Sequence, residues 1–70
     1  MSVIDHPAYY THGGIEAIDV IEAWKLGFNL GNVIKYLARA ESKFDALEDL
    51  RKARWYLDRE IAKREAKVKA

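Results

Sequence analysis

The chain has 70 residues, half of them hydrophobic and a third charged, which is typical of one small folded domain rather than of a disordered segment. It has no cysteine, so disulfides and thiolate metal sites are excluded, and regular helices and self-association remain as sources of stability for such a small core. The net charge of +1 gives no support to a broad nucleic-acid-binding surface, and no apolar run approaches the ~18 residues of a membrane span.

The basic residues are concentrated in the second half of the chain. Residues 1–31 contain a single one, Lys25, whereas residues 32–70 contain the other eleven lysines and arginines. This half can present a local anion-binding patch despite the low net charge. The N-terminus lacks the basic start and the apolar stretch of a signal peptide, so we expect a cytoplasmic protein.

Residues 1–14 are predicted to form an irregular loop. Pro7 disfavours helix at the preceding residue, and Gly13-Gly14 allows the chain to turn before a helix begins. Histidine is the usual general acid or base near neutral pH, so His6 is the candidate catalytic residue. The alternative is a loop that folds over the small core, and the chain has no glycine-rich phosphate-loop motif.

A first helix is predicted at residues 15–25, with Gly27 as a left-handed residue after its end. Apolar residues cover one broad side of this helix, and acidic residues gather on the other. Among these acids, Glu16 and Asp19 are candidate ligands of Mg²⁺, the one cofactor that the sequence suggests. The alternative is that they stabilise the positive N-terminus of the helix.

A second helix is predicted at residues 30–41, with Asn29 as its N-cap. Its apolar face follows the helical repeat, with Leu30, Val33, Ile34 and Leu37. Its opposite face carries a basic and polar set at the same spacing, which can bind one phosphate group through a lysine and an arginine one turn apart. The alternative for this set is an ordinary solvated face. The set consists of Asn32, Lys35, Tyr36 and Arg39.

A third, highly charged helix is predicted to begin near Asp45, its cap, and to run to about residue 67. Residues 62–70 are expected to project into solvent or to fray, because only Val68 anchors them. The short connection before this helix favours an antiparallel arrangement with the second helix. An apolar seam near heptad spacing runs along it, formed by Leu47, Leu50, Ala53 or Arg54, Leu57 and Ile61.

The third helix also carries a second basic face with aromatic residues. An aromatic ring beside cations can stack on a nucleotide base while the cations hold its phosphates. The alternative places Trp55 or Tyr56 in the core or in an oligomer contact. The face consists of Lys52, Trp55, Tyr56, Arg59 and Lys63.

These patterns together predict that residues 1–70 form a single all-α domain. It has two short helices and one long C-terminal helix, and it associates into a homo-oligomer.

Three sequence blocks, HPAYYTHGGIEAIDVIEAW, NLGNVIKYLARA and DLRKARWYLDREI, resemble a small domain family found mostly in bacteriophages, the DUF3310 or SaV-like family of unknown function. A domain of this kind occurs in the nucleotide kinase of T7-type phages, so the resemblance implies nucleotide chemistry. The chain departs from the family pattern in two places: Tyr9 replaces a second histidine, and Glu41-Ser42 replaces glycine and lysine. The matching positions are His6, Tyr10, Gly14, Glu16, Asp19, Asn32, Lys35, Tyr36, Arg39, Asp49, Lys52, Trp55, Tyr56 and Arg59.

These features predict a nucleotide- or phosphate-binding domain whose site is shared between subunits. One alternative is a nucleoside monophosphate kinase of the dTMP or dGMP type that works without a phosphate loop. Another is a phage module that sequesters a host signalling nucleotide or inhibits a host protein, and a third is a purely structural oligomerisation module. A kinase must hold two nucleotides with Mg²⁺ and exclude water, which a chain this short can hardly do alone. We therefore favour binding over catalysis, in the cytoplasm of the infected host if the chain is phage-encoded.

Overall fold

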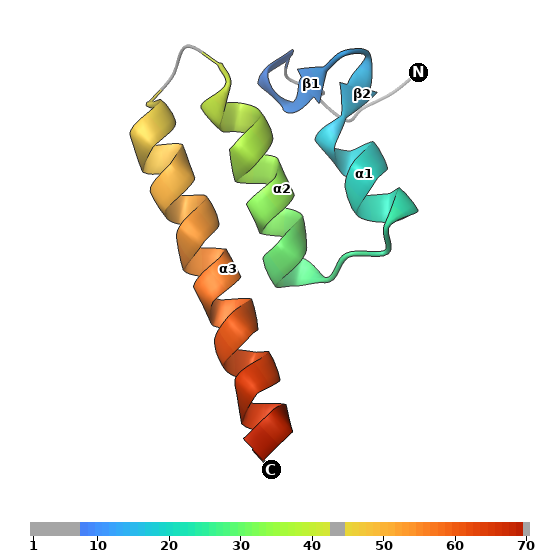
Figure 1. Ribbon diagram of the computed structural model, residues 1–70. Coiled ribbons are helices and arrows are strands. Elements are labelled where there is room, and N and C mark those ends of the chain that lie inside the picture. Colours follow the sequence, from blue (N-terminus) through green and yellow to red (C-terminus); the bar gives the residue numbers. More distant parts are fainter. Residues whose placement is uncertain (1–7, 43–44, 70) are drawn as a thin grey trace.

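The computed structural model describes residues 8–42 and 45–69, which form three helices and one short β-hairpin (Figure 1). A single 3-10 turn, η1 (Ala8–Tyr10), leads into the strands β1 (Thr11–His12) and β2 (Ile15–Glu16). The helices that follow are α1 (Ala17–Ala23), α2 (Phe28–Ala40) and α3 (Ala46–Lys69). The described residues are thus mostly helical, as predicted, but the hairpin was not predicted. None of these helices is both long enough and apolar enough to span a membrane.

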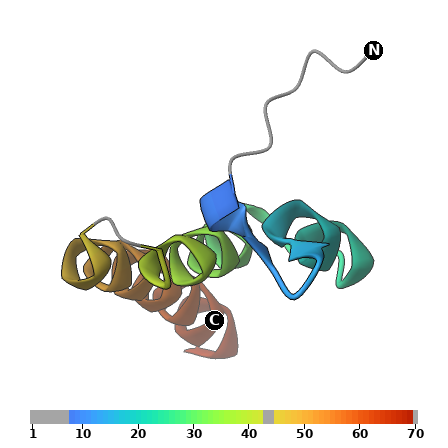
Figure 2. The same cartoon turned by 90° about the horizontal axis from the view of Figure 1, so that it is seen from above.

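The three helices lie side by side in one layer, with α2 between α1 and α3 (Figure 2). Successive helices run in opposite directions, as the short connection between the second and third helices predicted. A single layer encloses little space, so the buried hydrophobic side chains among the described residues are small: Ala17, Ala40 and Ala53. This thin core is the reason that many large apolar side chains stay exposed.

The predicted irregular loop is wrong for residues 11–14, which form a hairpin together with Ile15 and Glu16. Strand β1 pairs antiparallel with β2, Thr11 opposite Glu16, and the two-residue turn consists of Gly13 and Gly14. Both glycines have positive φ, 59° and 77°, which suits the tight turn that joins two twisted strands. Because residues 15 and 16 belong to β2, α1 begins two residues later than predicted.

The connection between α1 and α2 also differs from the prediction. Lys25, with a φ of 54°, is the left-handed residue after α1, and Gly27 instead has an extended conformation and serves as the N-cap of α2. The backbone N–H of Gly31 donates a 2.8 Å hydrogen bond to the carbonyl of Gly27. Asn29, the predicted N-cap, therefore lies within the first turn of α2, and its side chain donates to Glu60 of α3 at 3.2 Å.

Helix α3 begins as its sequence predicts. The Asp45 side chain accepts a 3.1 Å hydrogen bond from the backbone N–H of Glu48, so the predicted cap is confirmed. The helix then continues to Lys69, well past the region that packs against α2 (Figure 1). All side chains at residues 61–68 are exposed. The distal part of α3 therefore lacks packing partners within the described chain.

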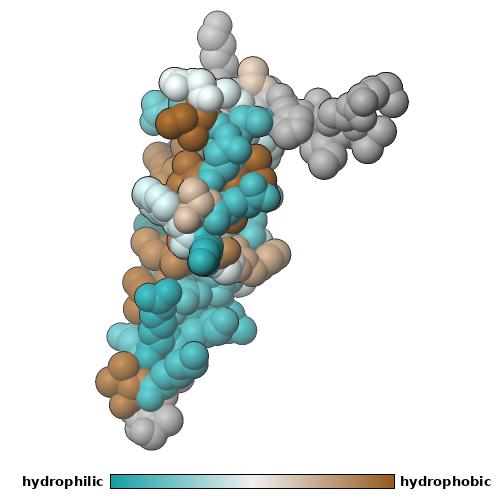
Figure 3. Space-filling model, turned by 90° about the vertical axis from the view of Figure 1, so that its right-hand side faces the viewer, coloured by the Kyte–Doolittle hydropathy of each residue, from teal (hydrophilic) through white to brown (hydrophobic). Residues whose placement is uncertain are grey.

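The layer of helices has two faces that no other described element covers, and one of them is apolar whereas the other is polar and basic. On α2, Asn29 and Tyr36 face α3, so the helical repeat of about 100° per residue places Leu30 and Leu37 on one free side and Lys35 on the other. The predicted seam of α3 lies on the same side as Leu37. Figure 3 shows the resulting band of hydrophobic side chains along one edge of the molecule. We call this the apolar face; it consists of Leu30, Val33, Leu37, Leu47, Leu50, Leu57 and Ile61.

Candidate functional site

The structure brings the two predicted basic faces of α2 and α3 together on the other free side of the layer. Tyr36 of α2 and Tyr56 of α3 stack with their ring centroids 6.0 Å apart and their planes only 14° from parallel. This contact joins the two helices and aligns their polar sides. We call the combined surface the basic–aromatic face. It excludes Lys63, which lies past the contact between Asn29 and Glu60, and consists of Asn32, Lys35, Tyr36, Arg39, Lys52, Trp55, Tyr56 and Arg59.

Two lysines from different helices lie over one ring at the centre of this face. The Nζ of Lys35 is 4.9 Å and the Nζ of Lys52 is 5.6 Å from the ring centroid of Tyr36. Cation–π contacts of this length hold the flexible lysine side chains near the ring. Neither lysine, nor Arg59 farther along α3, forms an ion pair within the described residues. Their positive charge is therefore available to an external anion.

Exposed aromatic rings border the lysine pair. The ring centroid of Tyr56 is 5.0 Å from that of Trp55 and 5.8 Å from that of Phe28, both in edge-to-face geometry. Trp55 is 62% exposed and Phe28 is 75% exposed, so the alternative that Trp55 fills the core of this chain is wrong. Phe28 was not predicted as a functional residue, because the predicted helix began at residue 30 and left Phe28 in the preceding turn, whereas α2 begins at Phe28.

Arg39 has a structural environment that the sequence did not reveal. Its Nε lies 3.4 Å from Oδ2 of Asp49, a carboxylate that is almost fully buried between α2 and α3. Its guanidinium also lies 5.0 Å from the ring centroid of Tyr9. A hydrogen bond with Tyr10, together with the negative charge of Asp49, raises the pKa of Arg39 above its ordinary value. Arg39 thus links the N-terminal segment, α2 and α3, and its ligand role stays a prediction.

Tyr10 contributes to this structural cluster. Its ring packs edge-to-face on Tyr9, with the centroids 4.4 Å apart, and its hydroxyl is within hydrogen-bonding reach of Arg39. Asn32 likewise has a local role, because its side-chain amide donates a 2.9 Å hydrogen bond to the carbonyl of Phe28 within α2. Neither contact tests the ligand-binding role that the helical spacing predicts for Asn32 and that the family resemblance implies for Tyr10.

The two predicted metal ligands cap a helix. Asp19 Oδ2 accepts a 3.1 Å hydrogen bond from the backbone N–H of Glu16, and the two residues form a capping box at the start of α1. They lie at the start of α1, on the opposite side of α2 from α3 (Figure 1). Within residues 8–42 and 45–69, no three His, Cys, Asp or Glu side chains gather as a metal site would require. The geometry therefore matches the helix-stabilising alternative.

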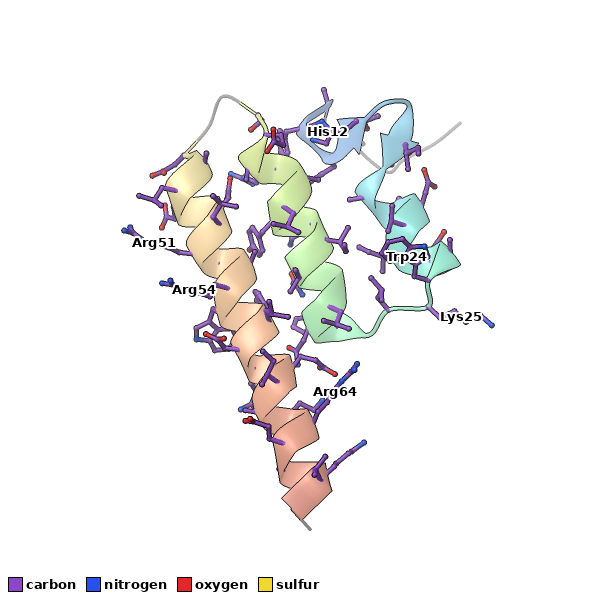
Figure 4. All side chains as sticks on the ribbon, in the orientation of Figure 1. His12, Trp24, Lys25, Arg51, Arg54 and Arg64 are labelled. Carbon is purple, nitrogen blue, oxygen red and sulfur yellow. The ribbon has the colours of Figure 1, made fainter. Side chains whose placement is uncertain are left out.

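Of the two loop histidines, His6 lies outside the described residues. His12 lies in β1 and points toward the C-terminal end of α2 (Figure 4), where its Nε2 donates a 2.6 Å hydrogen bond to the carbonyl of Ala38. This bond holds the hairpin against α2. The tautomer that it requires leaves only Nδ1 as a free ring nitrogen.

A shallow depression of about 500 Å³ adjoins the basic–aromatic face near the start of α3. It shares Lys52 and Trp55 with that face, but Arg51, Asp45 and Glu48 also line it, so its two cations are offset by two carboxylates. Two carboxylates beside an anion site weaken anion binding by repulsion. The lysine pair over Tyr36 is therefore the better candidate for a phosphate group, with the depression at its edge.

Comparison with known proteins identifies the family. A family model described as a protein of unknown function, DUF3310, matches residues 4–58. The chain belongs to the DUF3310 family. The matched segment contains the Tyr36–Tyr56 stack and both lysines, and it ends one residue before Arg59. No curated protein and no solved structure matches the chain.

Proposed function

We propose that this DUF3310 domain binds a phosphate-bearing small molecule, a nucleotide, on its basic–aromatic face. One observation carries the proposal: Lys35 and Lys52, from two different helices, both lie over the ring of Tyr36, which stacks on Tyr56. Two cations held close together, without carboxylate partners in the described residues, favour a group that carries more than one negative charge.

The aromatic residues suggest where the base lies. The rings of Tyr36 and Tyr56 already stack on each other, which leaves Trp55 as the large exposed ring next to Lys52. Stacking of a base on an exposed aromatic ring is worth about 1–3 kcal/mol and tolerates any base. In this arrangement the lysines and Arg59 hold the phosphates while Trp55 covers the base.

Phosphoryl transfer is the alternative function. The proposed resemblance to the domain of the T7-type phage nucleotide kinase favours it, with dTMP or dGMP as phosphate acceptor. A kinase needs Mg²⁺ between the phosphates. Asp19 and Glu16, the predicted Mg²⁺ ligands, cap α1 on one side of α2, whereas Lys52 belongs to α3 on the other side. This separation favours binding without catalysis.

Fluorescence titration tests the binding proposal. The Trp24→Phe variant leaves Trp55 as the only tryptophan, so its emission reports on a ligand that stacks there. We expect at least one of dTMP, dGMP, ATP or a cyclic dinucleotide to quench this emission in the presence of EDTA. The Lys52→Gln substitution should weaken that binding at least about tenfold, which corresponds to one charge-assisted contact.

Lys67→Gln is the matched control, because Lys67 is also exposed on α3 but lies near its end, away from Tyr36. It removes the same charge from the same helix and should leave the affinity unchanged. Equal losses of affinity in Lys52→Gln and Lys67→Gln would show that only net charge matters. If none of the nucleotides bound, the proposal would be refuted. Transfer of labelled phosphate from ATP to dTMP or dGMP, dependent on Mg²⁺, would instead establish the kinase alternative.

A further inference from the structure

The apolar seam of α3 is a continuous surface feature rather than part of the core. Leu47, Leu50, Leu57 and Ile61 alternate at spacings of three, seven and four residues, and each is at least two-fifths exposed. Arg54 occupies the missing position of this repeat. Such spacing places the side chains in one line along a helix, as in helices that pair with a second helix. Exposed apolar lines of this length mark contact surfaces.

No segment within the described residues covers this seam. Helix α2 contacts α3 through Asp49, Tyr56 and Glu60, which leaves the seam on a free side of the layer. The seam is continuous with Leu37 of α2, which is also exposed on the apolar face. It runs from the first turn of α3 to Ile61, which is level with the first turn of α2, and α3 itself continues beyond α2 (Figure 1). An occupant must therefore be long enough to reach both halves of α3.

We propose that a second copy of this chain covers the apolar face, with the two α3 helices antiparallel and Leu50 opposite Ile61 of the second copy. In this pairing the proximal half of each α3 packs on the distal half of the other. The part of α3 that extends beyond α2 then gains a partner, which the described residues of one chain do not provide. The same surface on both copies makes the contact a closed two-fold dimer.

Charge complementarity supports this register. Arg51 and Asp58 flank the seam on the same side, two helical turns apart, and both are exposed without an ion-pair partner in the described chain. Arg51 projects from the side of α3 that faces away from α2 (Figure 4). In an antiparallel pair, positions on this flank face one another across the seam. With Leu50 opposite Ile61, Arg51 of each copy faces Asp58 of the other, which forms two symmetric ion pairs.

Other pairings of the same two helices bring like charges together. If one helix is shifted by seven residues in one direction, Arg54 lies opposite Arg64 of the second copy, and the two Asp58 residues lie opposite each other. If it is shifted by seven residues in the other direction, the two Arg51 residues lie opposite each other. A parallel pairing places Arg54 beside Arg54 and Arg64 beside Arg64 at the centre of the contact. Like charges in contact disfavour these arrangements, so one register is selected.

The first test compares two isoleucines of equal exposure. Ile61 is 46% exposed and lies on the seam, whereas Ile18 of α1 is 45% exposed and lies outside the apolar face. Because both are already exposed in one chain, Ile→Glu at either site leaves the fold intact. By sedimentation equilibrium, wild type and Ile18→Glu should dimerise equally, and Ile61→Glu should raise the dimer Kd at least about a hundredfold, since the change occurs twice. A monomeric wild type at high micromolar concentration, or equal behaviour of the two variants, would overturn the proposal.

The second test determines register and direction. The chain has no cysteine, so introduced thiols cross-link without competition. In the proposed pairing, a mixture of Leu50→Cys and Ile61→Cys chains forms a disulfide-linked heterodimer under mild oxidation. Each variant alone stays unlinked, because its two thiols are about 16 Å apart along the helices and a disulfide spans less than about 7 Å between Cα atoms. Cross-linking of either variant alone, as a parallel pair would give, overturns the antiparallel register.

Charge reversal provides an independent readout of the flanking ion pairs. Arg51→Glu and Asp58→Arg each place two like charges together and should weaken the dimer at least about tenfold. The double variant restores opposite charges and should return the dimer Kd to within about threefold of wild type. Additive weakening in the double variant would refute the pairing of Arg51 with Asp58.

Discussion

Replacing Arg39 by methionine distinguishes its structural role from its predicted role in ligand binding. Arg39 connects α2 to Asp49 of α3 and to Tyr9 and Tyr10 of the N-terminal segment. Methionine retains the apolar stem and the helix propensity of the site but removes the guanidinium. The substitution therefore leaves the carboxylate of Asp49 between the helices without its cation.

The expected destabilisation follows from the burial of Asp49, which is only 3% exposed. A buried carboxylate that loses its partner costs about 3–5 kcal/mol, and the lower end applies here because water reaches the partly exposed guanidinium side of the pair. The whole free energy of unfolding of a domain this size is about 4–10 kcal/mol. Loss of this pair therefore removes a large share of the total, and the variant should be partly unfolded at 37 °C.

Urea unfolding followed by circular dichroism measures this effect. Replacing both members of the pair, Arg39→Met with Asp49→Leu, should recover most of the loss, because two apolar side chains leave no buried charge. An Arg39→Met variant that unfolds at the same urea midpoint as wild type would refute this structural role of Arg39. If such a stable variant no longer bound nucleotide, Arg39 would be a ligand-binding residue, as the sequence predicted.

Three smaller perturbations test the packing and the caps. Gly31→Ala should raise the free energy of unfolding by about 0.5–1 kcal/mol in the same urea assay, because glycine lowers helix stability. The added Cβ would lie 3.4 Å from Ile21 Cγ2, an ordinary contact distance. Gly31→Leu should lower the free energy of unfolding instead. Asp45→Ala should cost about 1 kcal/mol through loss of the α3 cap, with unchanged stability as the contrary result. Hydrogen bonds from Arg64 and then from Asn29 lower the pKa of Glu60, so its contribution is present above its ordinary pKa of 4.5 and is lost as the pH falls through the lowered value. The melting temperatures of wild type and Glu60→Gln should therefore approach each other as the pH falls below 4.5. A difference in melting temperature that stays constant with pH would contradict this.

The sequence predicted the helices well because their periodicity is strong. The repeat from Leu30 to Leu37 and the cap at Asp45 are local signals, and both helices appear close to the predicted bounds. The hairpin was missed because its strands have only two residues each, too short for an alternating pattern. Gly13-Gly14 was recognised as a turn, but nothing in its neighbours indicated that the chain would return on itself.

The candidate site shows the same limit. Helical spacing alone grouped Lys35 with Tyr36 on one helix and Lys52 with Tyr56 on another, but the stack that joins the two groups depends on how α2 and α3 align. The role of Asp49 is also a tertiary property. Its partner Arg39 is on a different helix, and an acidic residue in the first turn of α3 looks like an ordinary contribution to the helix dipole.

The placement of the two faces leads to a last prediction, on whether subunits share the nucleotide site. The apolar face and the basic–aromatic face lie on opposite sides of one helical layer, so a dimer formed through the first leaves the second open in each copy. The site predicted from the sequence, shared between subunits, would require a further contact near Tyr36. We therefore expect Ile61→Glu, although monomeric, to bind nucleotide with the wild-type Kd when titrated by Trp55 fluorescence in the Trp24→Phe background. Binding that disappears together with the dimer would mean that the second copy completes the site, and would restore the shared-site prediction.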